Sequence, residues 1–255
     1  MRKQKLVVSL IIGSVLCISS SYADTFGGIE FPNGAVSFAD EVILYDPNYS
    51  GGPNPTEPTS IDPQDALGVP DFPDGGSVGD EGAVSLGRGG LIELRFTNNF
   101  LVNSGNSTDD LHIFEIGPDV EDTYVSIRPT AETVLLLGAS YDANGDGYYE
   151  IGKVSGSISS IDIDSFFSGY EAGELVFDAV QLIDDYDEGN TSGPTVGADI
   201  DAVGAIGSIR LCNYYLIGDL DYDCDVDLND FALMASNWLV DCDIEPENPS
   251  CIPIQ

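Results

Sequence analysis

Six aspartates near the carboxyl end of the chain have a spacing that suits cation binding. They fall within twelve residues, and five of them occupy alternate positions. Alternate residues of a tight loop point to its centre, where a calcium ion takes six to eight hard oxygen ligands. The spacing therefore predicts a calcium loop whose positions 1, 3, 5, 7, 9 and 12 face the ion. These positions are Asp219, Asp221, Asp223, Asp225, Asp227 and Asp230.

The residues that follow predict a helix starting at the last ligands of this loop. Apolar side chains recur at i, i+3, i+4, i+7 and i+8 and form one face. Asp227 stands where an N-cap would, and acidic side chains favour a helix start. A solvated acidic tail is the alternative, but it does not explain the apolar face. That face consists of Phe231, Met234, Ala235, Trp238 and Leu239.

The loop departs from the general EF-hand pattern in two places. Position 6, where a sharp turn favours Gly, is Cys224, and position 12 is Asp230 in place of Glu. With no helix before it and F-A-x-x-A-x-x-W-L after it, the segment 218–239 resembles a dockerin type I repeat of secreted bacterial proteins. The resemblance implies calcium binding. Dockerins with two repeats dock to a cohesin scaffold protein, but the segment 241–251 has acids without ligand register.

The stretch DANGDGYYE predicts a second calcium loop. It places acids and an amide at positions 1, 3 and 5, followed by glycine at position 6. Position 12 would be Lys153, so a further ligand must come from elsewhere. The alternative is a hairpin turn, since Asp-Gly is a common turn pair. The predicted ligands are Asp142, Asn144, Asp146, Tyr148 and Glu150.

The first 23 residues have the regions of a secretory signal peptide. A basic start, MRKQK, precedes 13 mostly apolar residues, and small residues at Ser21 and Ala23 favour cleavage after Ala23. We therefore expect a secreted or cell-surface protein. No later segment approaches about 18 apolar residues, so no membrane span is predicted.

Export would place the cysteines in an oxidising compartment. Four of the five lie in the last 44 residues, and an even cluster predicts two disulfides. Zinc is the alternative, but no CxxC is present. A helix of about 11 residues would separate Cys224 from Cys242 by about 16 Å, whereas bridged Cα atoms lie within about 7 Å. We favour the pairs Cys212–Cys224 and Cys242–Cys251.

The charge balance excludes some partners. The chain of 255 residues has 44 acidic and 8 basic residues, a net charge of −36. Without the three basic residues of the signal peptide the net charge is −39. Nucleic acid and anionic membranes would repel such a chain, and cations are its natural small partners.

Residues 24–208 predict an all-β fold, an antiparallel β-sandwich of jelly-roll type. Short apolar alternations are broken by Gly, Asn, Asp and Pro, and no helical period is sustained. Residues 46–80 read as a long surface loop. The Cys-rich tail, 209–255, is too small for its own core and needs disulfides or metal. The expected strands lie in 35–45, 83–98, 111–117, 123–129, 133–141, 175–185 and 198–206.

Four segments resemble a family of exported bacterial β-sandwich modules. They are DALGVPD (65–71), VSLGRGGLIELRFTNN (84–99), DDLHIFEIG (109–117) and GADIDAVGAI (197–206). The resemblance implies a surface or extracellular module akin to carbohydrate-binding domains, in which a structural calcium is common. Outward-facing acids on a solvated face are the alternative. The candidate ligands are Asp109, Asp110, Glu115, Asp199 and Asp201.

Signatures of catalysis are scarce. The sequence has no H-E-x-x-H, and we expect its one histidine, His112, to be an exposed strand residue. The patterns favour a secreted, calcium-binding, non-catalytic module that binds or attaches to glycans or a protein scaffold. The alternative is a carbohydrate-active enzyme or accessory sugar-binding domain tethered by the tail, since two carboxylates can serve a glycosidase.

Overall fold

The computed structural model describes residues 23–73, 76, 80–116, 120–138, 141–156, 158–212, 214, 216–220, 224, 226–238 and 240–244. Of the predicted signal peptide, residues 1–23, only Ala23 belongs to this set. Within the described residues the chain forms two compact units. One contains residues up to 214 together with Cys224, and the other contains residues 216–220 and 226–244.

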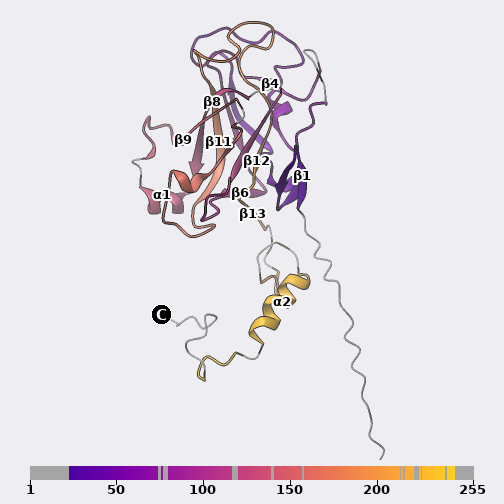
Figure 1. Cartoon of the computed structure of the whole chain (residues 1–255), viewed down its shortest axis with the longest axis vertical. Helices are drawn as coiled ribbons and strands as arrows, with labels where there is room; N and C mark the ends of the chain where they lie inside the picture. Colours follow the sequence, from indigo (N-terminus) through magenta and orange to yellow (C-terminus); the bar gives the residue numbers. More distant parts are fainter. Residues whose placement is uncertain are drawn as a thin grey trace, which may run out of the picture. The chain divides into compact units, whose positions relative to one another are not determined.

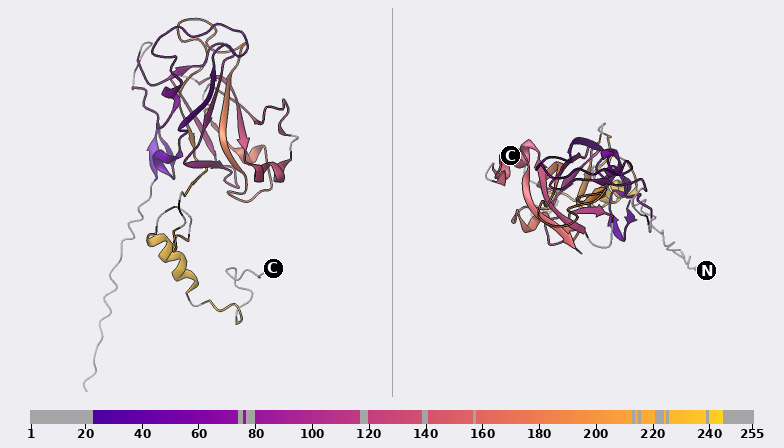
Figure 2. Two further views of the ribbon diagram at one scale, coloured as in Figure 1. Left: turned by 180° about the vertical axis from the view of Figure 1, so that it is seen from behind. Right: turned by 90° about the horizontal axis from the view of Figure 1, so that it is seen from above.

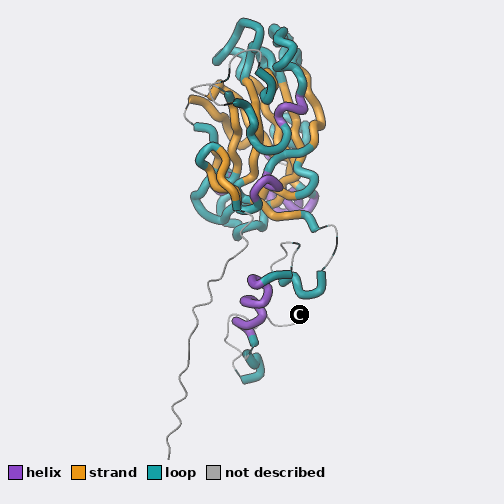
Figure 3. Tube along the Cα trace, turned by 90° about the vertical axis from the view of Figure 1, so that its right-hand side faces the viewer, coloured by secondary structure: helices purple, strands orange, loops and turns teal. Residues whose placement is uncertain are grey.

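The larger unit is an antiparallel β-sandwich, which confirms the predicted all-β fold class (Figures 1 and 3). Its strands are β3 (Glu41–Asp46), β4 (Val84–Ser85), β5 (Leu91–Arg95), β6 (Asn99–Val102), β7 (Leu111–Glu115), β8 (Val120–Pro129), β9 (Tyr149–Gly156), β10 (Ser160–Ile161), β11 (Val176–Asp184), β12 (Asp199–Ala205) and β13 (Ser208–Arg210). One sheet has the order β10-β7-β12-β4. The other has the order β13-β6-β11-β5-β3, and β8 pairs with both β11 and β9.

The main core lies between these two sheets. Leu94, Ile127 and Val180 from the larger sheet belong to one buried cluster with Ile113 and Val203 from the smaller sheet. Each burial of such a side chain stabilises the fold by about 1.5–3 kcal/mol. The apolar alternation in the sequence therefore corresponds to the inner faces of a sandwich.

The smaller sheet is also covered on its second face. The aromatic cluster on this face consists of Phe26 of β1 (Asp24–Phe26), Phe31 of β2 (Ile29–Phe31), Phe38, which follows the 3-10 helix η1 (Gly34–Ser37), and Phe114 of β7. The ring centroids of Phe31 and Phe38 lie 4.7 Å apart. A Cβ on Gly204 would lie 2.5 Å from the Phe31 ring, so only glycine permits this approach.

This cover corrects the prediction for His112, which is 8% exposed. Its ring packs edge-on against Phe114, with centroids 4.4 Å apart, and its Nδ1 lies 2.7 Å from the Ser160 hydroxyl. Burial lowers the pKa of His112 to about 4. Alternation in β7 assigned His112 to an outer face, but that face is not in solvent.

A second correction concerns residues 133–141, where we expected a strand. The chain forms the helix α1 (Ala131–Leu137), which contacts β8 and β11 (Figure 1). Thr130 caps it, because its hydroxyl accepts from the backbone N–H of Thr133. Gly138, with a φ of 81°, ends it.

The loop after β3 packs against other loops at one end of the sandwich (Figure 2, left). The backbone N–H of Ser50 donates to Gly89 O at 3.0 Å, and that of Thr56 donates to Pro194 O at 2.8 Å. Between β3 and β4 the described residues form turns and the 3-10 helix η2 (Pro63–Ala66). The long loop is therefore held by backbone hydrogen bonds from two other segments.

The smaller unit contains the helix α2 (Leu228–Asn237), at the position where the apolar spacing predicts one. In the described part of the chain, no helix has the length and apolar character needed to cross a membrane.

Candidate functional site

The loop between α1 and β9 turns its side-chain oxygens onto its own backbone. Asp142 Oδ1 accepts from Gly145 N at 2.7 Å, and its Oδ2 accepts from Gly147 N at 3.1 Å. Asn144 Oδ1 accepts from Asp146 N at 2.9 Å, and Asp146 Oδ1 accepts from Tyr148 N at 2.9 Å. These bonds curl the chain around the side chains at positions 1, 3 and 5, which is the local geometry of an oxygen-ligand loop.

Further contacts draw the same loop together. Asn144 Nδ2 donates to Asp146 Oδ2 at 3.0 Å, and Ala143 N donates to Glu150 Oε2 at 3.4 Å. The loop joins a helix to a strand, so the alternative of a β-hairpin turn is wrong. The structure thus brings the side chains of Asn144 and Asp146 together on one short loop, while Asp142 holds the turn through backbone N–H groups.

Lys153, at position 12 of this loop, is engaged elsewhere, since its Nζ lies 2.7 Å from Asp185 Oδ2. Glu93, in β5, is a candidate for the missing ligand. Gln181 Nε2 donates both to Asp146 Oδ2 at 3.2 Å and to Glu93 Oε1 at 3.1 Å. Gln181 therefore connects Glu93 to the loop through two hydrogen bonds. The sequence spacing did not reveal this connection.

The tail loop is described in part. Asp219 and Asp230 are 6% and 2% exposed, although a solvated acidic tail would leave them in water. Asp230 accepts from the backbone N–H of Leu220 and, at 2.7 Å, from that of Asp227. The residue at position 12 thus reaches back to position 2 and to the start of α2. The predicted ligands Asp221, Asp223 and Asp225 lie outside the described residues.

Cys224 occupies position 6 in a left-handed conformation. Its φ is 75°, and it is the one non-glycine residue with positive φ in the described part of the chain. This is the conformation for which the pattern places Gly there. The disulfide Cys212–Cys224 is present, with Cα atoms 5.2 Å apart, as predicted. Cys242 is also disulfide-bonded, and its predicted partner Cys251 lies outside the described residues.

The five acidic candidates of the sandwich do not form one site. Asp109 is exposed. Asp201 accepts from the backbone N–H groups of Asp71 and Phe72, at 3.0 and 3.4 Å, and so holds the loop before β4. Glu115 and Asp199 do come together, because Asp199 N donates to Glu115 Oε1 at 3.3 Å.

Glu115 and Asp199 belong to a larger acidic group that includes Glu121 and Asp184. Burial raises the pKa of Glu115 to about 8 and that of Glu121 to about 7, and neighbouring carboxylates add to both shifts. Burial also raises the pKa values of Asp184 and Asp199 to about 6. Such a group gains from taking up either protons or a cation.

Asp110 lies in a different acidic cluster, with two residues that we did not predict. One carboxylate oxygen of each of Asp110, Asp162 and Asp164 lies within 4.8 Å of the others. Burial raises the pKa of Asp110 to about 7, against the hydrogen bond from Ile163 N that lowers it. The alternate acids of IDIDSF (161–166) carried the same D-x-D signal as the other loops.

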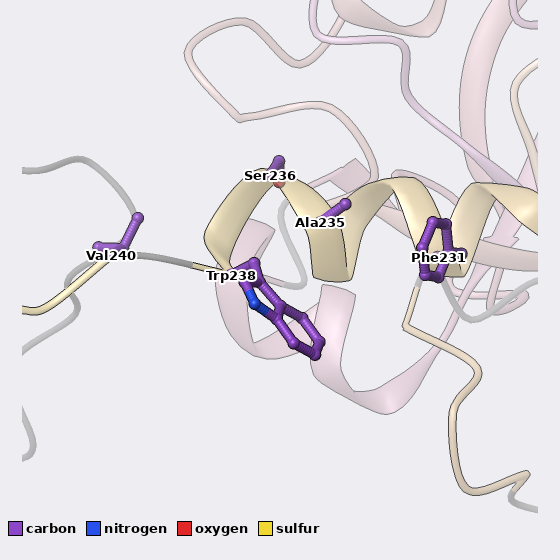
Figure 4. A pocket seen from close by; sticks show the side chains of 5 residues that line it. All are labelled: Phe231, Ala235, Ser236, Trp238 and Val240. Carbon is purple, nitrogen blue, oxygen red and sulfur yellow. The ribbon is translucent and has the colours of Figure 1, made fainter. Parts of the chain in front are cut away.

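The helix α2 presents apolar side chains to solvent. Phe231 and Trp238 are 58% and 70% exposed. With Ala235, Ser236 and Val240 they line a cavity of about 600 Å³ (Figure 4). Large exposed aromatics on one helix face are typical of interaction surfaces.

The chain matches no model of a known protein family, no curated protein and no solved structure.

Proposed function

We propose that this protein is an exported, calcium-binding, non-catalytic binding or attachment module. The observation that carries the proposal is the loop 142–150, where the residues at positions 1, 3 and 5 curl the backbone by their own hydrogen bonds. Glu150, at position 9, returns to the loop start. Carboxylate and amide oxygens held in this way are hard ligands of the kind that calcium prefers.

The tail supports the same proposal. Asp219 and Asp230 are buried at the two ends of the twelve-residue stretch, and Cys224 has the left-handed turn needed between them. The resemblance to a dockerin type I repeat adds a role in attachment. On this view the exposed face around Trp238 contacts a cohesin-like scaffold protein. Secretion rests on the signal peptide pattern of residues 1–23.

Calorimetric titration of the metal-free mature protein with calcium tests the proposal. We expect a heat of binding and a higher melting temperature with calcium than with chelator, because a ligand that binds only the folded state stabilises it. The variant Asp142→Asn/Asp146→Asn should lose one equivalent of calcium. Asp187→Asn/Glu188→Gln, which removes the same two charges at exposed residues, should lose none.

No heat of binding and no effect of chelator on the melting temperature would refute calcium binding. A glycan array, with an assay for turnover, then distinguishes a glycan-binding module from a carbohydrate-active enzyme. Binding without turnover supports a glycan-binding module, and turnover would replace the proposal with its alternative, a carbohydrate-active enzyme.

A further inference from the structure

We propose that Asp110, Asp162 and Asp164 form a separate calcium site in the sandwich, beside a polar surface cavity. Asp110 directly precedes β7, and Asp162 and Asp164 flank Ile163 at the start of the 3-10 helix η4 (Ile163–Ser165). Antiparallel pairing of β10 with β7 brings the two segments together. The site deepens the proposed calcium-binding function and rests on it only for the choice of ion.

The cluster carries negative charge that no described basic side chain compensates. Three carboxylates whose oxygens lie within 4.8 Å repel one another. In the described part of the chain, Arg95, Arg128 and Lys153 form ion pairs with other acids, and no basic side chain pairs with this cluster. A cation is therefore the missing partner.

Two carboxylate oxygens of the cluster are buried without a hydrogen-bond donor. Asp110 is fully buried, and its Oδ2 accepts from Ile163 N at 2.8 Å. Its Oδ1 is buried and has no hydrogen-bond partner, and neither does the buried Oδ1 of Asp162. Burying a carboxylate oxygen without a partner is costly, and coordination to a metal ion removes that cost.

The remaining carboxylate, that of Asp164, is already held in place by hydrogen bonds. Asp164 Oδ1 accepts from Asn103 Nδ2 at 2.9 Å, and its Oδ2 accepts from Gly105 N at 2.8 Å and Ser104 Oγ at 3.2 Å. These neutral donors orient the side chain and leave its charge uncompensated. A ligand fixed by surrounding hydrogen bonds loses little freedom when an ion binds.

The cavity gives an ion access to two of the three carboxylates, those of Asp162 and Asp164. It has a volume of about 420 Å³, and both Asp162 and Asp164 line it. Its wall includes further oxygen-bearing residues, Asn106, Ser107, Tyr170 and Glu171. Water in such a cavity can complete the coordination of calcium, which takes six to eight oxygens. No histidine or cysteine lies in the cluster or on the cavity wall, so zinc and softer metals do not fit it.

The variant Asp162→Asn tests the site with little risk to the fold, because the Asp162 side chain makes no hydrogen bond to the described residues. We expect the mature protein with this substitution to bind one calcium ion fewer than the wild type, or to bind that ion about tenfold more weakly, since a charged ligand becomes neutral. Excess magnesium should compete poorly. Unchanged stoichiometry and affinity in Asp162→Asn would overturn the proposal.

A parallel titration followed by amide NMR locates the ion. The N–H groups of Ile163 and Gly105 donate to Asp110 and Asp164, so calcium should shift both signals in the wild type and in Asp142→Asn/Asp146→Asn. It should not shift them in Asp162→Asn. If only the double variant loses calcium, this site is wrong and the proposed function stands. If the wild type binds no calcium, both are wrong.

Discussion

Replacing Glu115 with glutamine tests the electrostatics of the larger acidic group. Burial raises the pKa of this carboxyl from 4.5 to about 8. The folded state therefore keeps a proton that the unfolded state loses. The resulting stability is fully present below about pH 4.5 and is lost as the pH rises through about 8. At 1.36 kcal/mol per pKa unit, the loss approaches about 5 kcal/mol, an upper figure because solvent penetration reduces it.

The glutamine variant cannot ionise, so it should not show this loss. Glu115 accepts from two backbone N–H groups, those of Glu121 and Asp199, and an amide oxygen can replace only one acceptor. Losing the other costs about 1–3 kcal/mol at every pH. We expect Glu115→Gln to be less stable than the wild type at pH 5 and more stable at pH 9.

Urea unfolding followed by far-UV circular dichroism measures this crossing. The buffers must be metal-free, because calcium would favour the ionised carboxylates and hide the effect. Glu188→Gln, at an exposed residue, serves as the control and should follow the wild type at both pH values. Parallel stability curves for Glu115→Gln and the wild type would show that Glu115 titrates as an ordinary carboxyl, and the reasoning would fail.

Three further predictions concern backbone conformation and packing. Cys212→Ser/Cys224→Gly should retain calcium binding by the tail, whereas Cys212→Ser/Cys224→Ala should bind calcium more weakly. The reason is that alanine in a left-handed conformation costs about 1–2 kcal/mol. Equal calcium affinities of the two variants in calorimetry would refute a role for the turn. Phe38→Ala should lower the free energy of unfolding by about 3–5 kcal/mol, since its ring is 1% exposed in the aromatic cluster; a loss below about 1 kcal/mol in urea unfolding would contradict the cover over the smaller sheet. Thr133→Val should cost about 1–3 kcal/mol, since the Thr133 hydroxyl donates to Val176 O and accepts from Val176 N; a neutral effect on the melting temperature would show that these bonds do not matter.

The sequence predicted those parts of the fold that depend on local pattern. Alternation located β5, β7, β11 and β12, because their inner residues face one core. It failed at α1, where the apolar run TVLLL resembled a strand. Thr130 and Gly138 decide that segment by capping a helix. It also failed at His112, since no local pattern shows that a distant hairpin covers its face.

The candidate sites also differ in whether local spacing or the tertiary fold brings their residues together. The loop 142–150 has its candidate ligands within nine residues, so spacing alone located the loop that Asp142, Asn144 and Asp146 curl by their hydrogen bonds. Asp110 and Asp164 are separated by more than fifty residues in the chain, and strand pairing is what brings them together. Alternate acids mark the half of this site at Asp162 and Asp164, but only the topology joins it to Asp110.

The order of strands in the two sheets has a consequence for how the chain folds. β11 pairs with β5, β6 and β8, and β12 pairs with β4 and β7, yet both strands lie after residue 175. A nascent chain that ends before Val176 lacks an inner strand of each sheet and cannot close the core. The sandwich must therefore assemble late, through contacts between distant parts of the chain, which makes folding slow. Until β12 has been synthesised, the apolar faces of the earlier strands lack their native partners.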